Sequence, residues 1–229
     1  MIERASDMST PSAKRALFGE FASVAKSIAH AHRLEILEQL AQGERSVEVL
    51  ADRIELSIAN TSQHLQQLRR AGIVDARREG KFVFYFLRDE TVLRLLASLR
   101  QVAENNLSEV EYLVRTYFNN RDSLDPVSRD ELMSLLRAES VTVLDVRPID
   151  EFALGHLPSA VNIPLRELKK RLAKLDRSHE VVAYCRGPYC VLSYEAVALL
   201  RKHGFKARRL VDGFPEWKAE GLPTASKRV

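Results

Sequence analysis

Residues 181–192 read VVAYCRGPYCVL, and this stretch decides the fold of the second half of the chain. The run from Val181 to Tyr184 is apolar and rich in β-branched residues, which is typical of a buried strand. A loop with glycine and proline follows at residues 186–190, and a helical pattern begins directly after it. A strand, a short loop and a helix in this order indicate an α/β domain with a largely parallel sheet.

On both sides of this stretch the sequence also predicts strands that alternate with helices. Further strands are predicted at residues 141–145 and 208–211, and helices at residues 165–175 and 193–203. These elements predict an α/β domain with a mostly parallel sheet over residues 128–226.

Cys185 stands at the carboxyl end of the predicted strand, where sites form in parallel sheets. The following helix begins within a few residues, and its N-terminal N–H groups favour a thiolate. Arg186 adds positive charge next to the sulfur. These features predict a nucleophilic cysteine, with a buried structural thiol as the alternative.

The first half of the chain is mainly helical. Two short amphipathic helices are joined by a tight turn at residues 55–57, which is the layout of a helix-turn-helix. Ser46 and Ser57 are predicted N-caps, and Gly72 is predicted to end the second helix. Its polar side chains suit hydrogen bonds to base edges, so we expect DNA contacts from Ser57, Asn60, Thr61, Ser62, Gln63, His64 and Gln67.

Two β-rich runs, residues 73–78 and 82–87, are separated by a glycine and predict a hairpin. Arg77, Arg78 and Lys81 lie at its tip and flanks. Basic side chains in this position suit phosphate contacts, although a solvated face is the alternative.

The segments HRLEILEQL, LADRIELSIANTSQHLQQLRRAGIV and ARREGKFVFYFL together resemble the ArsR-type winged-helix repressors over about residues 18–99. The resemblance implies a homodimer that binds a palindromic double-stranded operator. It also implies a long C-terminal helix, residues 93–118, that helps to form the dimer. We therefore expect a DNA-binding and dimerisation domain at residues 15–119, between a flexible tail at 1–14 and a polar linker at 120–127.

Many proteins of this family sense metals through cysteine or histidine ligands. Both cysteines of this chain lie in its second half, and His64 is interpreted as a DNA contact. We therefore expect neither a metal site nor a cofactor.

The segments LDVRPIDEFALGHLPSAVNIP, YCRGPYC and LVDGFPEWKAEGLP resemble the rhodanese domain over about residues 128–224. This family transfers sulfane sulfur through a cysteine persulfide. The resemblance implies a persulfide on Cys185, with Arg186 and Cys190 in the catalytic loop. It implies a cradle for the terminal sulfur made by Gly187, Pro188, Tyr189 and Val191. It gives mainly structural roles to Asp145, Arg147, Glu151, His156, Gly213 and Trp217.

Cys190 departs from the family pattern, because the loop often ends in a basic residue that helps to bind thiosulfate. A thiol there predicts poor use of thiosulfate and permits a disulfide or trisulfide with Cys185. A small packing residue is the alternative interpretation of Cys190.

The composition limits the remaining possibilities. The chain has 229 residues, a net charge of +4 and two cysteines, which argues against a secreted disulfide scaffold. It has no apolar run of about 18 residues, and its N-terminus is charged, so neither a membrane span nor export is expected. A cytoplasmic protein is the expectation.

Together these features predict a DNA-binding transcriptional regulator, a repressor that senses reactive sulfur through a persulfide on Cys185. The alternative function is a sulfurtransferase that takes sulfur from thiosulfate or polysulfide, with DNA binding secondary. A third interpretation makes the rhodanese-like part an inert interaction module.

Overall fold

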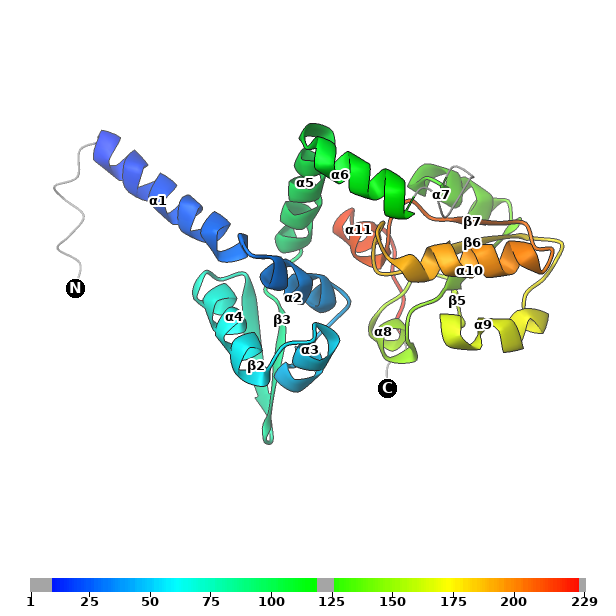
Figure 1. The fold of residues 1–229 in the computed structure, drawn as a ribbon, viewed down its shortest axis with the longest axis horizontal. Coiled ribbons are helices and arrows are strands. Elements are labelled where there is room, and N and C mark those ends of the chain that lie inside the picture. Colours follow the sequence, from blue (N-terminus) through cyan, green and yellow to red (C-terminus); the bar gives the residue numbers. More distant parts are fainter. Residues whose placement is uncertain (1–9, 119–125, 227–229) are drawn as a thin grey trace. The chain divides into compact units, whose positions relative to one another are not determined.

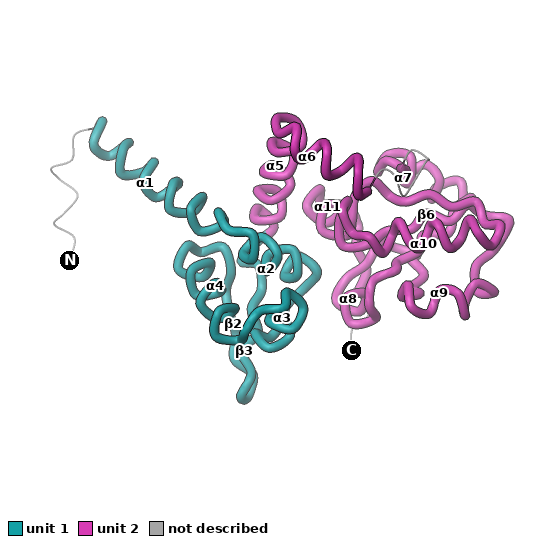
Figure 2. The backbone as a smooth tube through the Cα atoms, viewed as in Figure 1, with its two compact units in different colours: residues 1–89 teal, residues 90–229 magenta. Residues whose placement is uncertain are grey.

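The computed structural model describes residues 10–118 and 126–226. The chain divides into two compact units, residues 1–89 and residues 90–229 (Figure 2). Helix α1 begins at Thr10, so residues 10–14 are helical and differ from the flexible tail expected at 1–14. The rest of that tail and most of the expected linker lie outside the described residues, and the proposed domain limits stay predictions.

The first unit is a set of helices with a small antiparallel sheet (Figure 1). Its elements are α1 (Thr10–Ile28), α2 (Ala31–Ala41), β1 (Arg45–Ser46), α3 (Val47–Arg53), α4 (Ile58–Arg70), β2 (Val74–Glu79) and β3 (Phe82–Leu87). The strand order is β1-β3-β2. The short strand β1, which pairs with β3, was not anticipated from the sequence.

The predicted helix limits in this unit are confirmed by their caps. The Ser46 side chain accepts a hydrogen bond from the Val49 N–H, and the Ser57 side chain accepts one from the Asn60 N–H. Gly72 has a φ of 72°, the left-handed conformation that ends a helix at low cost with glycine. The core is apolar and consists mainly of Ile36, Leu37, Leu40, Leu50, Leu65 and Leu68.

The second unit has an α/β fold, as predicted. Its four-stranded sheet has the order β5-β4-β6-β7, and every pairing is parallel. Its elements are α5 (Thr91–Asn106), α6 (Ser108–Leu113), the π-helix η1 (Val114–Phe118), α7 (Arg129–Arg137), β4 (Val141–Asp145), α8 (Ile149–Leu154), β5 (Val161–Asn162), α9 (Leu165–Arg171), the 3₁₀ helix η3 (Leu172–Lys174), β6 (Glu180–Tyr184), α10 (Val191–Lys202), β7 (Ala207–Arg209) and α11 (Phe214–Ala219).

Helices cover both faces of this sheet. Alternate residues of β6 point to opposite faces, because the side-chain period of a strand is two. Val181 and Ala183 pack in a cluster with residues of α9 and α10. Val182 and Tyr184 pack in a second cluster with residues of α7 and α11. Cys185 follows β6 and belongs to the first cluster.

The single long helix expected at residues 93–118 is wrong. The helix α5 ends at Asn106, and Leu107 takes an extended conformation with φ −113° and ψ 107° before α6 begins. Two asparagines and a serine surround this position, and such side chains compete with helical hydrogen bonds. The Asn106 side chain does so here, since its amide donates to the Val102 carbonyl.

None of the helices in the described ranges is long and apolar enough to cross a membrane.

Candidate functional site

Helix α4 exposes two of the side chains that were expected to face DNA and leaves a third half-buried. Asn60 and Gln63 are exposed, and Ser62 is half-buried. The hydroxyl of Ser57 is used as the N-cap of this helix. The exposed amide side chains are therefore free to reach a partner beyond the helix.

Two residues of this set have partners inside the unit instead. Thr61 is fully buried, and its hydroxyl donates to the Ser57 carbonyl at 3.0 Å, which corrects the expected DNA contact. The Gln67 side-chain oxygen accepts from Arg33 Nη1 at 2.8 Å. Both corrections have one cause, since these positions are on or beside the face of α4 that packs against the core.

His64 lies in a group of three histidine rings. Its ring centroid is 4.7 Å from that of His30 and 6.0 Å from that of His32. Burial, together with the charges of His30 and Arg33, lowers the pKa of His64. Within the described residues, no group of three or more histidine, cysteine or acidic side chains is arranged to hold a metal ion.

The three basic residues of the hairpin differ in whether a carboxylate already binds them. Arg77 is bound by two carboxylates: its Nε lies 2.8 Å from Glu44 Oε2 and its Nη1 lies 2.6 Å from Glu79 Oε2. These hydrogen bonds raise the pKa of Arg77 and occupy its guanidinium. Arg78 and Lys81 are exposed, with Arg78 donating to the Gly80 carbonyl. The basic groups most available for phosphate are therefore Arg78 and Lys81.

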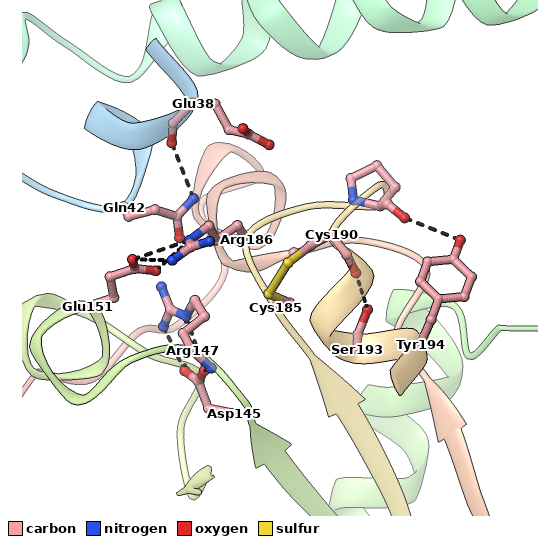
Figure 3. Close-up of a disulfide and its surroundings, with 12 residues drawn as sticks. Glu38, Gln42, Asp145, Arg147, Glu151, Cys185, Arg186, Cys190, Ser193 and Tyr194 are labelled. Atoms are coloured by element: carbon pink, nitrogen blue, oxygen red, sulfur yellow. Dashed lines mark hydrogen bonds and ion pairs between the residues drawn. A yellow bond between two sulfur atoms is a disulfide. The ribbon is translucent and has the colours of Figure 1, made fainter. Parts of the chain in front are cut away.

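In the second unit, Cys185 and Cys190 lie at the two ends of one loop and are joined by a disulfide (Figure 3). Their Cα atoms are 6.1 Å apart. Cys185 follows β6 and is almost fully buried, while Cys190 is the residue before the first turn of α10. The loop is thus short enough to bring both sulfur atoms together, a question that the sequence left open.

The loop backbone turns several N–H groups away from protein acceptors. Cys190 N–H donates to the Gly187 carbonyl at 3.1 Å, which closes the loop. Among the described residues, the N–H groups of Gly187, Tyr189 and Val191 donate to no protein acceptor. Pro188 has no N–H, so the cradle role expected for it is wrong. Its carbonyl instead accepts from the Tyr194 hydroxyl at 3.3 Å.

Arg186 is held by a buried carboxylate. Its Nη2 lies 2.8 Å from Glu151 Oε1 and its Nε lies 3.0 Å from Glu151 Oε2, a two-point contact visible in Figure 3. Glu151 has no exposed surface. Arg186 therefore braces the loop against α8, and its charge is balanced rather than directed at Cys185 alone.

A second buried ion pair lies beside the loop. Arg147 and Asp145 are both fully buried, with Arg147 Nη2 at 2.7 Å from Asp145 Oδ2. The guanidinium also donates to the Gly155 carbonyl and lies 4.5 Å from the centroid of the Phe214 ring. The bracing roles expected for Asp145, Arg147 and Glu151 agree with these contacts.

Gly213 supports the loop from the other side. A Cβ at this position would overlap the backbone of Arg186 and Gly187. The Gly213 N–H donates to Glu216 Oε2 at 3.0 Å, and the Phe214 N–H donates to the Cys185 carbonyl at 3.1 Å. The turn before α11 is thus packed against the loop between Cys185 and Cys190, a proximity that the sequence did not reveal beyond a packing role for Gly213.

Helix α5 supplies two further residues near the loop, and sequence reasoning missed both. Arg100 Nη1 lies 2.6 Å from Glu216 Oε1. One turn later, Glu104 accepts a hydrogen bond from the Tyr189 hydroxyl. Burial and this hydrogen bond raise the pKa of Tyr189, so the hydroxyl keeps its proton and acts as the donor. The local signal for this pair was only two charged residues spaced by four on one helix.

Comparison with known proteins agrees with the two units. Residues 28–77 match a helix-turn-helix domain family, and residues 128–220 match the rhodanese-like domain. The chain is 42% identical over 210 residues to the HTH-type transcriptional regulator Rv0324 of Mycobacterium tuberculosis, covering 92% of each chain. It is 32% identical over 90 residues to a sulfurtransferase of Allochromatium vinosum, which covers 39% of this chain and 82% of that protein.

Among solved structures, the winged helix-turn-helix domain Mb0332 of Mycobacterium bovis is similar, with 42% identity. That domain is described as homodimeric and as a possible ArsR-family regulator. The match covers 41% of this chain and 87% of that one, with a TM-score of 0.39.

Proposed function

Because the chain belongs to the HTH-type transcriptional regulators that join an N-terminal ArsR-type helix-turn-helix domain to a C-terminal rhodanese domain, we propose that it is a repressor that senses reactive sulfur at Cys185. The observation that carries the proposal is the disulfide between Cys185 and Cys190 inside the rhodanese loop. Because this loop brings two thiols together, transfer of sulfur to Cys185 can be followed by formation of the Cys185–Cys190 disulfide, which is a lasting covalent change in the protein.

The chemistry needs two balanced steps. In the first, the Cys185 thiolate attacks the sulfane sulfur of a persulfide or polysulfide donor R–S–SH, breaks its S–S bond and releases the thiolate RS⁻. In the second, the Cys190 thiolate attacks Cys185 Sγ of the persulfide and releases HS⁻, which leaves the disulfide. The donor is reduced and the two protein thiols are oxidised, so no further oxidant is required.

The loop suits the intermediate of this sequence. The N–H groups of Gly187, Tyr189 and Val191 can donate to the terminal sulfur, which carries negative charge after the first step. Because Cys190 occupies the place where a cation would help to bind a dianion, a persulfide donor whose sulfur carries a single charge is favoured over the thiosulfate dianion.

The DNA-binding half of the proposal rests on α4 and the hairpin. Exposed amides on α4 can hydrogen-bond to base edges in a major groove, while Arg78 and Lys81 can contact phosphates. Exposed apolar side chains on α5, namely Leu95, Leu99 and Val102, suit a homodimer on a two-fold symmetric operator.

The test is fluorescence anisotropy of the full chain on duplex DNA from its own promoter region at fixed salt. Reduced protein, polysulfide-treated protein and treated Cys185→Ser protein are compared. We expect treatment to change the affinity at least about fivefold, the usual lower range of allosteric coupling. The change should be absent in Cys185→Ser, whose basal binding should be intact. Equal affinities for reduced and treated wild-type protein would contradict the proposal.

A second candidate function is sulfur transfer with turnover, favoured by the cradle of unpaired N–H groups around Cys185. An enzyme must cycle, whereas a sensor reacts once. Release of more than one sulfide per chain, in the presence of excess polysulfide and a thiol acceptor, would favour the enzyme. Cys190→Ser is informative here, because it blocks the disulfide while leaving the first transfer step possible.

A further inference from the structure

Helix α5 contacts the loop between Cys185 and Cys190 at one place, and at a second place it contacts helix α11, whose first turn supports that loop. Glu104 accepts a hydrogen bond from the hydroxyl of Tyr189, which is a loop residue. Arg100 binds Glu216, which in turn accepts the N–H of Gly213 at 3.0 Å. The two α5 residues are also linked, since Arg100 Nε lies 3.5 Å from Glu104 Oε1.

These contacts differ in how they relate to the sulfur atoms. Tyr189 directly precedes Cys190, so any movement of Cys190 is passed to Tyr189 through the backbone. Gly213 lies against the backbone of Arg186 and Gly187, at the other end of the loop next to the buried Cys185. The Glu104 contact is therefore next to the half-buried Cys190, and the Arg100 contact is linked through Glu216 and Gly213 to the part of the loop next to the buried Cys185.

The Tyr189 side chain has space beside it. A pocket of about 360 Å³ is lined by Tyr189, Glu104, Val110 and Val114, among other residues of this unit. The Tyr189 ring also lies near the Phe118 ring, with a centroid distance of 5.2 Å. If the disulfide is absent, Cys190 is no longer tied to Cys185, and the ring can move into this pocket.

We propose that the Glu104–Tyr189 hydrogen bond is a latch through which bridging of Cys185 and Cys190 fixes helix α5, with Arg100 and Glu216 as its permanent anchor. In the bridged state Tyr189 is held within reach of Glu104, as in the structure. In the reduced state the latch opens, and α5 keeps its Arg100–Glu216 contact. This inference rests on the proposed sulfur-sensing function and names the contact that carries its signal.

The variant that tests the latch is Glu104→Ala, with Glu109→Ala as the matched control. Glu109 is exposed on the neighbouring helix α6 and carries the same charge. Glu104→Gln is the conservative variant, because its amide oxygen can still accept from Tyr189. Tyr189→Phe removes the same hydrogen bond from the other side, in case one substitution alone perturbs the helix.

The full-length proteins are treated with sodium tetrasulfide, and mass spectrometry measures how much of each is bridged. DNA affinity is then measured for reduced and bridged protein. We expect wild type, Glu109→Ala and Glu104→Gln to change affinity at least about fivefold on bridging. Glu104→Ala should bridge fully and show no change in affinity, with its reduced affinity equal to that of wild type. Tyr189→Phe, compared at the bridged fraction that mass spectrometry measures for it, should likewise show no change in affinity on bridging. A full response in bridged Glu104→Ala would overturn the latch.

Hydrogen exchange separates failure of the latch from failure of the sensing function. Bridging should protect the amides of α5 in the wild-type chain, and this protection should be absent in Glu104→Ala. If bridging protects the α5 amides of the wild-type chain but leaves its DNA affinity unchanged, the sensing function is wrong and the latch is supported. If bridging leaves exchange in α5 unchanged in wild type, the latch is wrong whatever the DNA response.

Discussion

The hairpin of the first unit and the loop between Cys185 and Cys190 in the second unit both contain an arginine bound by a carboxylate, but the two pairs have different surroundings. Arg77 is exposed and shares its charge with Glu44 and Glu79. Arg186 is bound to Glu151, which has no exposed surface, and the neighbouring Arg147–Asp145 pair is fully buried. Removing one partner of an exposed pair costs little stability, whereas removing one partner of a buried pair leaves an uncompensated charge inside the fold.

The largest expected effect is the loss of a buried partner. Asp145→Ala leaves the Arg147 guanidinium without its carboxylate in a site closed to water. We expect the free energy of unfolding of this unit to fall by about 3–5 kcal/mol. Urea unfolding followed by circular dichroism measures this change. Glu44→Ala is the matched control, because it removes an exposed partner of the hairpin residue Arg77, and it should leave stability nearly unchanged. A similar loss of stability in both variants would contradict the distinction between the two regions.

A smaller effect is expected where the backbone of the loop is crowded. Gly213→Ala places a methyl group against the backbone of Arg186 and Gly187 and should destabilise the unit by about 1–3 kcal/mol. It should also slow alkylation of reduced Cys185, because the loop must shift to make room. Gly19→Ala in α1 meets no atom within 4 Å and should be neutral or slightly stabilising. An unchanged alkylation rate in Gly213→Ala would show that the loop tolerates the shift.

The smallest effects concern the exposed hairpin and appear in DNA binding alone. Arg78→Ala or Lys81→Ala should each reduce the salt dependence of DNA affinity by about one unit of slope, as expected for one lost phosphate contact. Arg77→Ala should do less, since Arg77 is already bound to two carboxylates. Glu44→Ala should instead raise DNA affinity by releasing Arg77. Anisotropy titrations at several salt concentrations measure all four, and a weaker affinity of Glu44→Ala would contradict this assignment.

The sequence predicted those features that depend on neighbouring residues. The strand at Val141–Asp145, the caps at Ser46 and Ser57 and the helix end at Gly72 were all expected and are all present. Each has a local cause, such as a β-branched run, a short hydroxyl side chain or a residue that tolerates positive φ.

The features that were missed depend on contacts between distant parts of the chain. Arg100 and Glu216 are separated by 116 positions, and no local pattern distinguishes Arg100 from other charged residues on α5. In the same way, the hydrogen bonds that hold the Arg186 guanidinium come from Glu151, which is 35 positions away in the sequence. Thr61 was expected to contact DNA as one of the polar side chains of this helix, but it is buried in the core and its hydroxyl donates to the Ser57 carbonyl.

Trp217 gives the chain an internal optical reporter. It is the single tryptophan of the sequence and is almost fully buried. Its backbone N–H donates a hydrogen bond to the Gly213 carbonyl, and its indole Nε1 donates one to the Pro223 carbonyl at 2.8 Å. Because Gly213 lies against the loop between the two cysteines, the emission of this one indole should respond to bridging of the two thiols. The kinetics of sulfur transfer could then be followed by stopped-flow fluorescence in the unlabelled protein, on the timescale of the reaction itself.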